Sequence, residues 1–531
     1  MKFQAIKGVR DILPPESALW NRVEQTAREV FGTFGFAEIR LPVFEPTELF
    51  ARAVGGETDI VSKEMYSFEI RTQQVDKLSQ LRAGILAIHP LRDDPLAPDV
   101  NIAWSVFQTG VGQVIGDARH DMEKGSIPDS AENRRCLTDL QQALDRINSL
   151  RVEYAQTKSD SVGSRLDLYV GHIHNALGNL RLGEDITLRP EATASVVRAY
   201  IEHGMRLRPG NVKLYYIGPM FRRERPQKGR YRQFYQIGAE LLGPSDHPAL
   251  DAEVIEMLMA FFGRLQLKGT TLYLNSIGDK NCRPAYVERL REELRKVKDQ
   301  LGPDSQRRIE TNPLRVLDSK LHEEQPVIAN LPRIADHLCE ECKNHYAKLK
   351  QELALRGIAY EENWRLVRGL DYYMRTTFEI TATGLGSQNA VCGGGRYDGL
   401  VELLGGPATT KGIGFAIGTD RLILSLEEAG QAAPKASIAV FLAWFGAPTY
   451  PSAVALTRKL REQGIAVEMP AVEMKFGKSL SLADRLGARY AVILGEEELA
   501  AKQFTVKRLA DGEQKKLSED DLLAYLQGAQ T

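Results

Sequence analysis

This sequence has few cysteines, no large excess of charge of either sign and no long apolar runs. The cysteines are odd in number and scattered, which excludes a disulfide-stapled secreted domain and favours a reduced cytoplasmic protein. They are Cys136, Cys282, Cys339, Cys342 and Cys392. No apolar run is long enough to span a bilayer, and the N-terminal segment MKFQAIKGVRDILPPE has no apolar signal core. Neither a membrane location nor export is therefore expected.

The charges of the two signs nearly cancel. Lysine and arginine number 69 and aspartate and glutamate 70, which gives a formal net charge of -1. Overall charge therefore indicates no nucleic-acid partner: DNA binding is not expected, and contact with RNA has to depend on local patches. Hydrophobic residues at 43% and charged residues at 26% are typical of a globular protein, and a length of 531 residues predicts three or four domains.

The periodicity of apolar residues predicts an α+β fold. Residues 16–31 have helical spacing, while FAEIRLPVFE and MYSFE are typical of strands. After residue 183 strands resume, with helices expected over 291–300 and 344–355. The strand candidates are DITLRPE, KLYYIGPMF, YRQFYQIGAE, TLYLNSI, RTTFEITAT and IGFAIG. Beyond a linker by composition at 430–436, alternating strands and helices predict a small α/β domain with a largely parallel sheet.

A different pattern fills residues 71–183. RTQQVDKLSQLRAGILAI is typical of a helix, and a break rich in proline and aspartate follows it. Residues 136–154 and 162–180 repeat apolar positions at spacings of three and four, which predicts two amphipathic helices. The stretch 111–116 is apolar and flanked by glycine, and its pattern assigns no element.

The stretch RYRQFYQIGAE, residues 230–240, alternates in chemistry. On a strand, successive side chains point to opposite faces. One face then carries two arginines, a ring, an amide and a carboxylate, and the other is mostly apolar or aromatic. Arginine suits phosphate, a ring can stack on a base, and an amide with a carboxylate suits a small polar ligand. The alternative is a solvated sheet face with arginine–glutamate pairs.

Ordered motifs favour the ligand-binding interpretation. Phe221-Arg222-x-Glu224, a basic turn and then Arg230-x-x-x-Phe234 resemble the second signature motif of class II aminoacyl-tRNA synthetases. GIGFAIGTDR at 412–421 resembles the third motif, and the first helix followed by EIRLP resembles the first, which builds the dimer interface of that class. The sequences most similar to histidyl-tRNA synthetase signatures are TLRPEATA, RLVRGLDYYMRT, GGGRYDGL, TNPLRVLDSK and ADRLGARYAVILGEEEL. Several long matches in order are far more specific than one short motif.

This resemblance implies the residues that bind ATP, which is a substrate. They are Arg222, Glu224, Arg230, Phe234 and Arg421. Arg222 would hold the α-phosphate, and Arg421 the γ-phosphate, while Phe234 stacks on adenine. Arg368 would add a second cation at the α-phosphate, so that Arg222, Arg368 and Arg421 form the catalytic set. Mg²⁺ would neutralise the remaining phosphate charge, with no metal-ligand residue identified.

The resemblance also implies a histidine pocket. Its residues are Glu191, Ala192, Thr193, Gln236, Glu240, Tyr372 and Tyr373. Glu191 and Thr193 would contact the amino group, and Glu240 with the tyrosines would recognise the imidazole, whose two nitrogens need a matched donor and acceptor. The products would be histidyl-adenylate and pyrophosphate, and then histidyl-tRNA made from tRNA(His), in a cytoplasmic homodimer.

The resemblance covers nearly everything outside residues 71–183 and gives a domain map. It comprises catalytic core at 1–70, 184–275 and 361–432, an unrecognised helical insertion at 71–183, a helical arm at 276–360 and an anticodon-binding domain at 437–531. In the family, the strands ending SFE and beginning TLRPE join through a short turn. We expect the insertion to open that turn and to fold as its own unit, either as a tolerated appendage or as a module that binds a partner or oligomerises.

Two further features, a candidate metal site and a candidate nucleophilic cysteine, each have a simpler interpretation. His337, Cys339, Cys342 and His345 have the side chains of metal ligands, but zinc usually takes its ligands from two separate turns, so packing of the thiols on a helix is the expectation. Cys392 has no partner in the sequence that would make it a nucleophile.

The alternative function is a non-catalytic, histidine-sensing regulatory paralogue or a scaffold. Such paralogues typically lose ligand residues and the anticodon domain, both of which this chain keeps.

Overall fold

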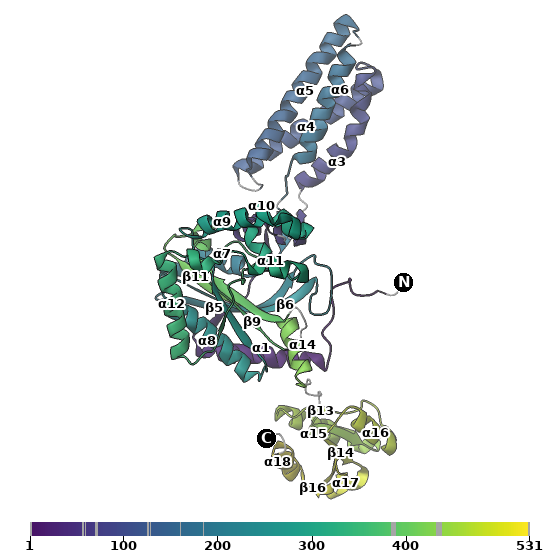
Figure 1. The fold of residues 1–531 in the computed structure, drawn as a ribbon. Coiled ribbons are helices and arrows are strands. Elements are labelled where there is room, and N and C mark those ends of the chain that lie inside the picture. Colours follow the sequence, from purple (N-terminus) through teal and green to yellow (C-terminus); the bar gives the residue numbers. More distant parts are fainter. Residues whose placement is uncertain are drawn as a thin grey trace.

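The computed structural model describes residues 3–55, 58, 60–69, 73–124, 127, 129–159, 161–183, 185–383, 389–431 and 438–528. Figure 1 shows a central α/β body with a bundle of long helices at one end and a small α/β domain at the other. Most of the expected linker at 430–436 lies outside the described residues. No helix among the described residues is long and apolar enough to cross a membrane.

The central body is built on an eight-stranded, mainly antiparallel sheet with the order β1-β5-β6-β11-β10-β9-β7-β8. In that order the strands are Ala37–Glu38, Val212–Phe221, Gln233–Gly243, Lys411–Gly418, Ala390–Arg396, Met374–Thr381, Thr271–Ser276 and Glu361–Glu362. Only the two short edge strands, β1 and β8, pair in parallel with their neighbours in this sheet. The α+β fold and the long strands of this sheet were therefore predicted correctly.

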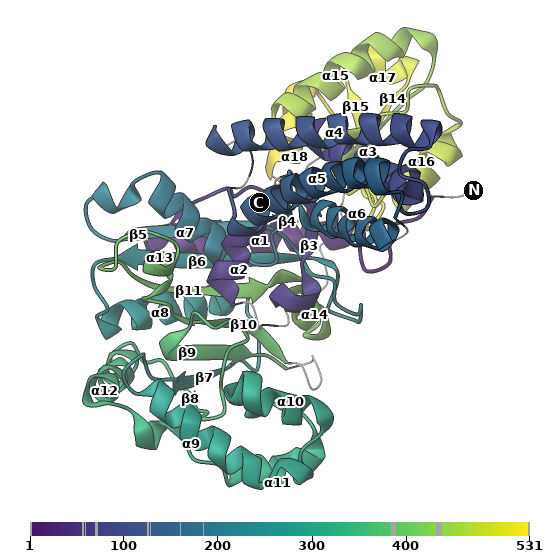
Figure 2. The same ribbon diagram turned by 90° about the horizontal axis from the view of Figure 1, so that it is seen from above.

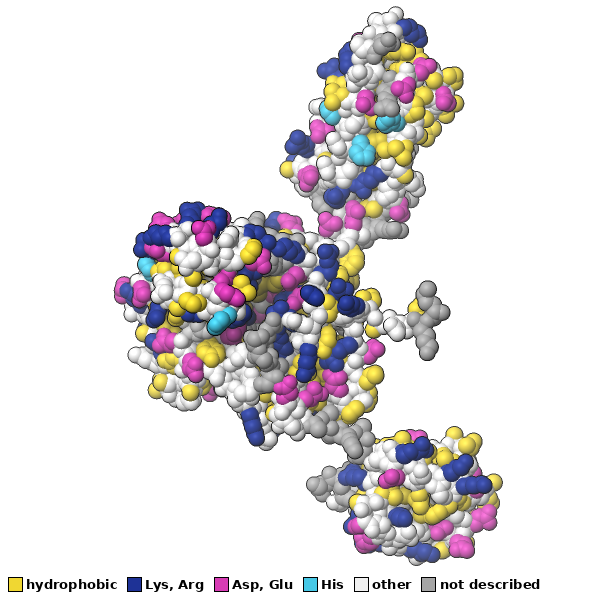
Figure 3. All heavy atoms as spheres, turned by 45° about the vertical axis from the view of Figure 1, so that its right-hand side comes forward, with side chains coloured by type: hydrophobic (Ala, Val, Ile, Leu, Met, Phe, Trp, Pro, Cys, Tyr) yellow, Lys and Arg dark blue, Asp and Glu magenta, His cyan; other side chains and the backbone are white. Residues whose placement is uncertain are grey.

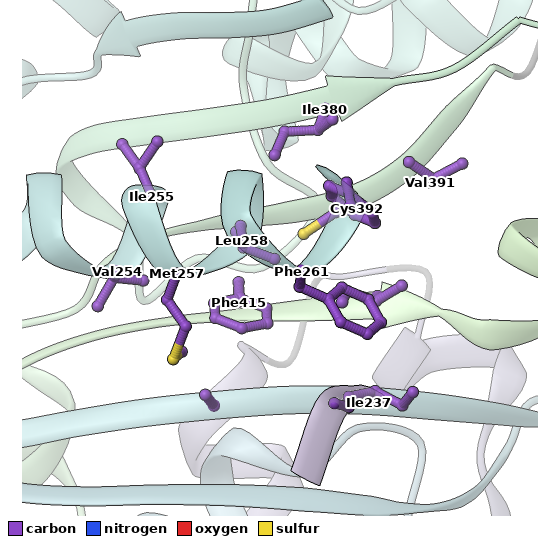
Figure 4. Packing of buried hydrophobic residues seen from close by; sticks show 14 of the residues in the cluster. Ile237, Val254, Ile255, Met257, Leu258, Phe261, Ile380, Val391, Cys392 and Phe415 are labelled. Carbon is purple, nitrogen blue, oxygen red and sulfur yellow. The ribbon is translucent and has the colours of Figure 1, made fainter. Parts of the chain in front are cut away.

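Alternation along β6 separates a core face from an open face, as the sequence predicts. Tyr235, Ile237 and Ala239 point into a core covered by α1 (Glu16–Thr33) and α8 (Pro248–Arg264). Figure 4 shows Ile255, Leu258 and Phe261 of α8 packed on side chains of the strands, namely Ile237 of β6, Cys392 of β10 and Phe415 of β11. Each fully buried side chain of this size stabilises the fold by about 1.5–3 kcal/mol, so the open face is held on a rigid layer.

A smaller sheet, β2-β4-β3, lies at the edge of the body and carries the helical bundle. Its strands are Phe44–Pro46, Asp185–Leu188 and Tyr66–Glu69. β3 and β4 pair antiparallel, with Tyr66 opposite Leu188 and Glu69 opposite Asp185. The chain therefore leaves for the bundle at the end of a strand pair, as expected for a hairpin whose turn is opened.

The bundle consists of α3, α4, α5 and α6 and has its own hydrophobic core. The helices span Gln73–Ile88, Pro98–Glu123, Ala131–Thr157 and Ser161–Asn179. Its buried cluster is drawn entirely from positions 75–182 and includes Trp104, Leu140, Ile147 and Ile173. The two amphipathic helices and the helix at its start are confirmed. The unassigned stretch 111–116 lies inside α4, because glycines lower helix propensity and hide the pattern.

A helical arm follows β7. The helix expected at 344–355 is confirmed, whereas the one expected at 291–300 is displaced, because the helix there spans Arg283–Lys296. The arm contains α9 (Arg283–Lys296), α10 (Pro303–Thr311), α11 (Gln325–Ala329) and α12 (Glu340–Leu355). Figure 2, viewed from above, shows these helices beside β7 and β9. Their core includes Tyr286, Leu290 and Ile309, and it joins Tyr373 of the central body. Short helices α2 (Thr47–Val54), α7 (Thr193–Glu202), α13 (Leu400–Leu403) and α14 (Thr419–Glu428) complete the body.

The C-terminal domain corrects one expectation. Its sheet has the order β13-β12-β14-β15-β16, with strands Val467–Glu468, Val440–Trp444, Tyr490–Leu494, Phe504–Arg508 and Gln514–Leu517. The helices are α15 (Tyr450–Glu462), α16 (Phe476–Arg485), α17 (Glu496–Ala501) and α18 (Glu519–Gly528). β14–β15 and β15–β16 are antiparallel, so half of the pairings are not parallel as expected. The final strands are short and largely polar, which concealed them from a search for apolar runs.

Candidate active site

A cavity of about 290 Å³ opens on the face of the central sheet. Eleven of the site residues predicted from the sequence line it: Glu191, Thr193, Arg222, Glu224, Arg230, Phe234, Gln236, Arg368, Tyr372, Tyr373 and Arg421. Residues from distant parts of the chain are thus brought together. Ala192 and Glu240 are buried and do not line the cavity, so neither meets a ligand directly in this arrangement.

Gln236 is placed on the cavity by the alternation of β6. It is partly buried, and its Oε1 has no hydrogen-bond partner among the described residues. A buried acceptor without a partner costs about 1–3 kcal/mol, so a donor supplied by a ligand would remove that cost. Gln236 therefore fits a polar ligand at the inner end of the cavity.

Two buried acidic side chains lie at that inner end, Glu191 on the cavity and Glu240 behind Thr193. Glu191 accepts hydrogen bonds from the backbone N–H groups of Thr193 (2.8 Å) and Ala194 (3.0 Å) at the start of α7. Glu240 accepts from the Thr193 hydroxyl at 2.6 Å and from the Tyr397 hydroxyl. Burial raises the pKa of Glu191, and it raises the pKa of Glu240 to about 8, with the neighbouring Glu191 adding to the effect. The pair can accept a cationic or proton-donating ligand.

Tyr372 and Tyr373 close this end from the other side. Their ring centroids are 4.7 Å apart, and the Tyr372 hydroxyl lies 3.5 Å from Glu191 Oε2. Burial raises the pKa of Tyr373 to about 12 and that of Tyr372 well above its ordinary value. Both phenols are therefore neutral at physiological pH and can donate hydrogen bonds.

Four arginines line the remainder of the cavity. Arg222 lies 5.2 Å from the ring centroid of Phe234, and its Nε donates to the Pro190 carbonyl at 3.0 Å. Arg230 pairs with Glu224 at 3.4 Å. Burial lowers the pKa of Arg421, and the nearby Arg230 lowers it further. So many cations at one end of a pocket suit a polyanion such as a triphosphate.

Arg368 is held by a contact that only glycine permits. Its Nη1 donates to Glu379 at 3.0 Å, and its guanidinium lies flat against β10 at Gly393. A Cβ at residue 393 would stand 2.1 Å from Arg368 Nη2. The glycine run in GGGRYDGL therefore leaves room for the Arg368 guanidinium on the cavity face of β10.

Several supporting residues escaped the sequence analysis. Tyr397 orients Glu240, and Glu379 pairs with Arg368. Asp420 accepts from the backbone N–H of Tyr235 at 2.9 Å and pairs with Arg10 at 3.3 Å, joining β6, α14 and the N-terminal segment. Tyr397 lies inside the motif GGGRYDGL, and Asp420 lies inside GIGFAIGTDR. Considering every polar residue of these two motifs would have found both.

An antiparallel sheet whose open face carries a motif-two hairpin, a glycine-rich third motif and a polyanion site defines a class II aminoacyl-tRNA synthetase. A family model for histidyl-tRNA synthetase matches residues 176–422, and one for an anticodon binding domain matches residues 440–529. The chain is 45% identical over 528 residues to a histidine–tRNA ligase of Koribacter versatilis, covering 99% of this chain and 96% of that one. The corresponding protein of Solibacter usitatus is 42% identical over 527 residues, 99% of each chain.

A crystal structure of apo histidyl-tRNA synthetase from S. aureus superimposes with a TM-score of 0.65 at 31% identity, covering 99% of this chain and 100% of that one. The chain belongs to the histidyl-tRNA synthetase family.

Proposed function

We propose that this chain is a histidine–tRNA ligase that activates L-histidine with ATP and transfers it to tRNA(His). The observation that carries the proposal is one cavity with the buried carboxylate of Glu191 at its inner end, Glu240 directly behind Thr193, and four arginines at the other end. A ligand bridging the two ends needs a cationic, proton-donating part and a polyanionic part, as histidine beside ATP provides.

At the inner end, Glu191 and Thr193 face the amino group of histidine, and Gln236 offers its unpaired oxygen. Glu240 lies behind Thr193 and accepts a hydrogen bond from its hydroxyl. We therefore assign Glu240 to the imidazole on the condition that this hydroxyl moves aside when histidine binds. Tyr372 and Tyr373 supply neutral donors to the ring. We assign Ala192 a structural role at the start of α7 and no side-chain contact with histidine.

At the outer end, a carboxylate oxygen of histidine attacks the α-phosphorus of ATP. A new P–O bond forms, the bond to the bridging oxygen breaks, and pyrophosphate leaves with that electron pair. Arg222 and Arg368 stabilise charge on the α-phosphate, and Arg421 holds the γ-phosphate. Phe234 stacks on adenine, with Glu224 near its amino group and Arg230 on the phosphates. A ribose hydroxyl of tRNA(His) then displaces AMP.

Mg²⁺ fits this outer end. Glu224 and Glu379 both line the cavity beside the arginines, and Mg²⁺ usually binds through one or two carboxylates together with substrate phosphates. When bound, the ion neutralises charge on the departing pyrophosphate. The protein residue that would hold it is Glu379, now paired with Arg368; Glu224 is already assigned to the adenine amino group.

The remaining assignments concern the assembly. We assign tRNA binding to the C-terminal domain and homodimer formation to the edge of the body around β2 and β3. There Phe44 and Phe68 are each about half exposed, at 54% and 51%, and such rings are commonly buried between subunits. None of the five cysteines forms a disulfide among the described residues, which supports a cytoplasmic location. The domain map is proposed with the boundaries given above.

Charging of tRNA(His) with labelled histidine tests this function against the alternatives. A ligase charges the tRNA, and truncation after Ser437 leaves histidine adenylation detectable while charging collapses, because adenylation needs only the catalytic body. A histidine-sensing regulator or an inactive scaffold charges none. Undiminished charging by the truncated chain at low tRNA concentration would refute the role of the C-terminal domain.

A further inference from the structure

A compact group of metal-ligand side chains lies behind the active site, where the arm meets the sheet. It consists of Asp279, Cys282, Cys339 and Cys342, whose ligand atoms all lie within 4.8 Å of one another. Among the residues that the structure describes, this is the only such group of three or more histidine, cysteine or acidic side chains. None of these four residues lines the cavity described above.

The four residues come from two separate turns with the same spacing. Asp279 and Cys282 lie just before α9 as D-x-x-C, and Cys339 and Cys342 lie at the start of α12 as C-x-x-C. Two turns with this spacing are the usual framework of a structural zinc site. The first turn was not recognised in the sequence, because an aspartate replaces one of the four expected cysteines and a long segment separates the two halves.

This group differs from the metal-binding candidate in the sequence, which combined Cys339 and Cys342 with the two histidines. His337 is exposed, and His345 Nε2 lies 3.1 Å from the Asp246 carbonyl, in a different set of contacts. The expected simple packing of the thiols on one helix is also incomplete, because Cys339 precedes α12 and only Cys342 lies within it.

Three of the six ligand–ligand distances are close to the edges of a tetrahedron around zinc. Cys282 Sγ lies 3.9 Å from Cys342 Sγ and 3.6 Å from Asp279 Oδ1, and Cys339 Sγ lies 3.9 Å from Asp279 Oδ1. With a Zn–S bond of about 2.3 Å, tetrahedral geometry places two sulfurs about 3.8 Å apart. A disulfide needs about 2.05 Å between sulfurs, so these thiols are not arranged as one.

The backbone around the first turn is shaped for a sulfur ligand. The backbone N–H of Asp279 donates to Cys282 Sγ at 3.4 Å. Gly278 has a φ of +65°, and a Cβ there would stand 2.8 Å from that sulfur. The turn therefore depends on glycine both for its conformation and for the space that Cys282 occupies. Asp279, Cys282 and Cys342 are nearly fully buried.

Outer contacts link this group to the histidine pocket. Arg375 Nη2 pairs with Asp279 Oδ2 at 3.3 Å, and Arg283, next to Cys282, donates to the Tyr373 carbonyl at 2.5 Å. Hydrogen-bonded neighbours of this kind orient metal ligands and offset their charge. A metal here would fix the turn that positions Tyr373.

We propose that Asp279, Cys282, Cys339 and Cys342 bind one zinc ion as a closed structural site that joins the arm to the catalytic sheet. The ligands are three thiolates and one carboxylate oxygen, which completes four-coordination and leaves no open position for a substrate. The three thiols release their protons when the metal binds. The site is independent of whether the cavity activates histidine, and it is tested without any activity assay.

The test is the metal content of the full chain purified under reducing conditions without chelators. We expect about one zinc per chain by elemental mass spectrometry, and at least a tenfold loss in Cys339→Ser and in Cys342→Ser. Cys136→Ser and Cys392→Ser, buried cysteines elsewhere in the chain, are the matched controls and keep the metal. Equal loss in the controls, or a wild-type chain that neither carries zinc nor takes it up on dialysis, overturns the proposal.

A second measurement covers the case in which the cysteine variants fail to fold. Wild-type protein stripped of zinc and loaded with Co²⁺ alone should show the visible band of tetrahedral cobalt and a near-ultraviolet thiolate-to-cobalt band. It should also protect Cys282, Cys339 and Cys342 from alkylation. An octahedral cobalt spectrum, unchanged alkylation, or a Cys282–Cys342 disulfide in the reduced preparation contradicts the site.

Discussion

At the scale of single residues, the site depends on charge that the backbone holds in place before any substrate arrives. Glu191 is fixed by two N–H groups of α7, and Arg368 is pressed against Gly393. Groups positioned in advance need no rearrangement as charge develops, which is the main source of electrostatic catalysis. The predictions at this scale concern the two charged ends of the cavity.

Arg222→Ala and Arg368→Ala each remove a cation from the end assigned to the α-phosphate. We expect kcat for histidine-dependent adenylation to fall by about 10²–10³, equivalent to about 2.7–4 kcal/mol of lost transition-state stabilisation, with the circular dichroism spectrum unchanged. Arg223→Ala is the matched control, because Arg223 is the exposed neighbour of Arg222 and does not line the cavity. Wild-type kcat in either cavity variant would remove that arginine from the mechanism.

Glu240 gives a pH dependence of known sign. Its pKa is raised from 4.5 to about 8 in the folded chain, so between these values the folded state holds a proton that the unfolded state has released. Stability from this group is fully present below pH 4.5 and is lost as pH rises towards 8. We therefore expect the Tm of Glu240→Gln, measured by calorimetry, to rise relative to wild type from pH 5 to 8. A difference that is constant over this range would show that Glu240 is ionised throughout.

At the scale of elements, the strands of the central sheet are joined by a buried ionic network rather than by packing alone. Arg396 on β10 is 1% exposed; its Nε donates to Asp251 of α8 at 2.9 Å, and its Nη1 donates to Asp398 at 2.7 Å. Thr376 on β9 donates to the same Asp251 at 2.6 Å. Asp251 of α8 thus joins two neighbouring strands, β9 and β10, to the helix that covers them.

Arg396→Met keeps the bulk of the side chain and removes its charge, leaving two buried carboxylates without their cation. Removing one partner of a buried ion pair costs about 3–5 kcal/mol, so we expect a loss of this size in the free energy of unfolding measured with urea. Arg458→Met is a milder control, because Arg458 is 80% exposed and pairs with the exposed Glu462. Equal small losses in the two variants would show that the network contributes little.

Elements with a regular pattern were predictable, and the exceptions have physical reasons. The alternation in β6 and the helical spacing in α1 both depend on one-sided burial, which leaves a clear period in the sequence. α4 was missed because its glycines suppress that period, although Gly110 lets α3 approach closely: a Cβ there would meet Leu81 at 2.8 Å. The position of Glu240 behind Thr193, and the joining of Asp279 to the three thiols, depend on tertiary contacts that no local pattern contains.

At the scale of the whole molecule, the bundle and the catalytic body have separate cores joined through a strand pair. Glu69 Oε1 accepts from the Gly183 N–H at 3.2 Å, just where the chain returns from the bundle. The face of the bundle seen in Figure 3 carries several hydrophobic side chains. Leu86, Ile102 and Val106 are exposed residues of the bundle.

Replacing residues 71–183 with a short Gly/Asn turn should leave histidine-dependent pyrophosphate exchange within about threefold of wild type, because the β3–β4 register closes as a hairpin without the bundle. Light scattering on the same protein then tests the module: an altered assembly state or a lost partner supports it, and an unchanged state supports a tolerated appendage. A shortened protein that no longer folds would place the bundle in the catalytic core.

The most direct test of the central claim is ATP–pyrophosphate exchange with a panel of amino acids on the full chain. Histidine should drive exchange, while threonine, proline and glycine should give rates near background, because the neutral phenols of Tyr372 and Tyr373 are placed to hydrogen-bond a polar ring beside Glu191. Glu191→Gln should lose most of the histidine-driven exchange. Exchange driven equally by another amino acid, or no exchange with any of them, would contradict the assignment of this cavity to histidine activation.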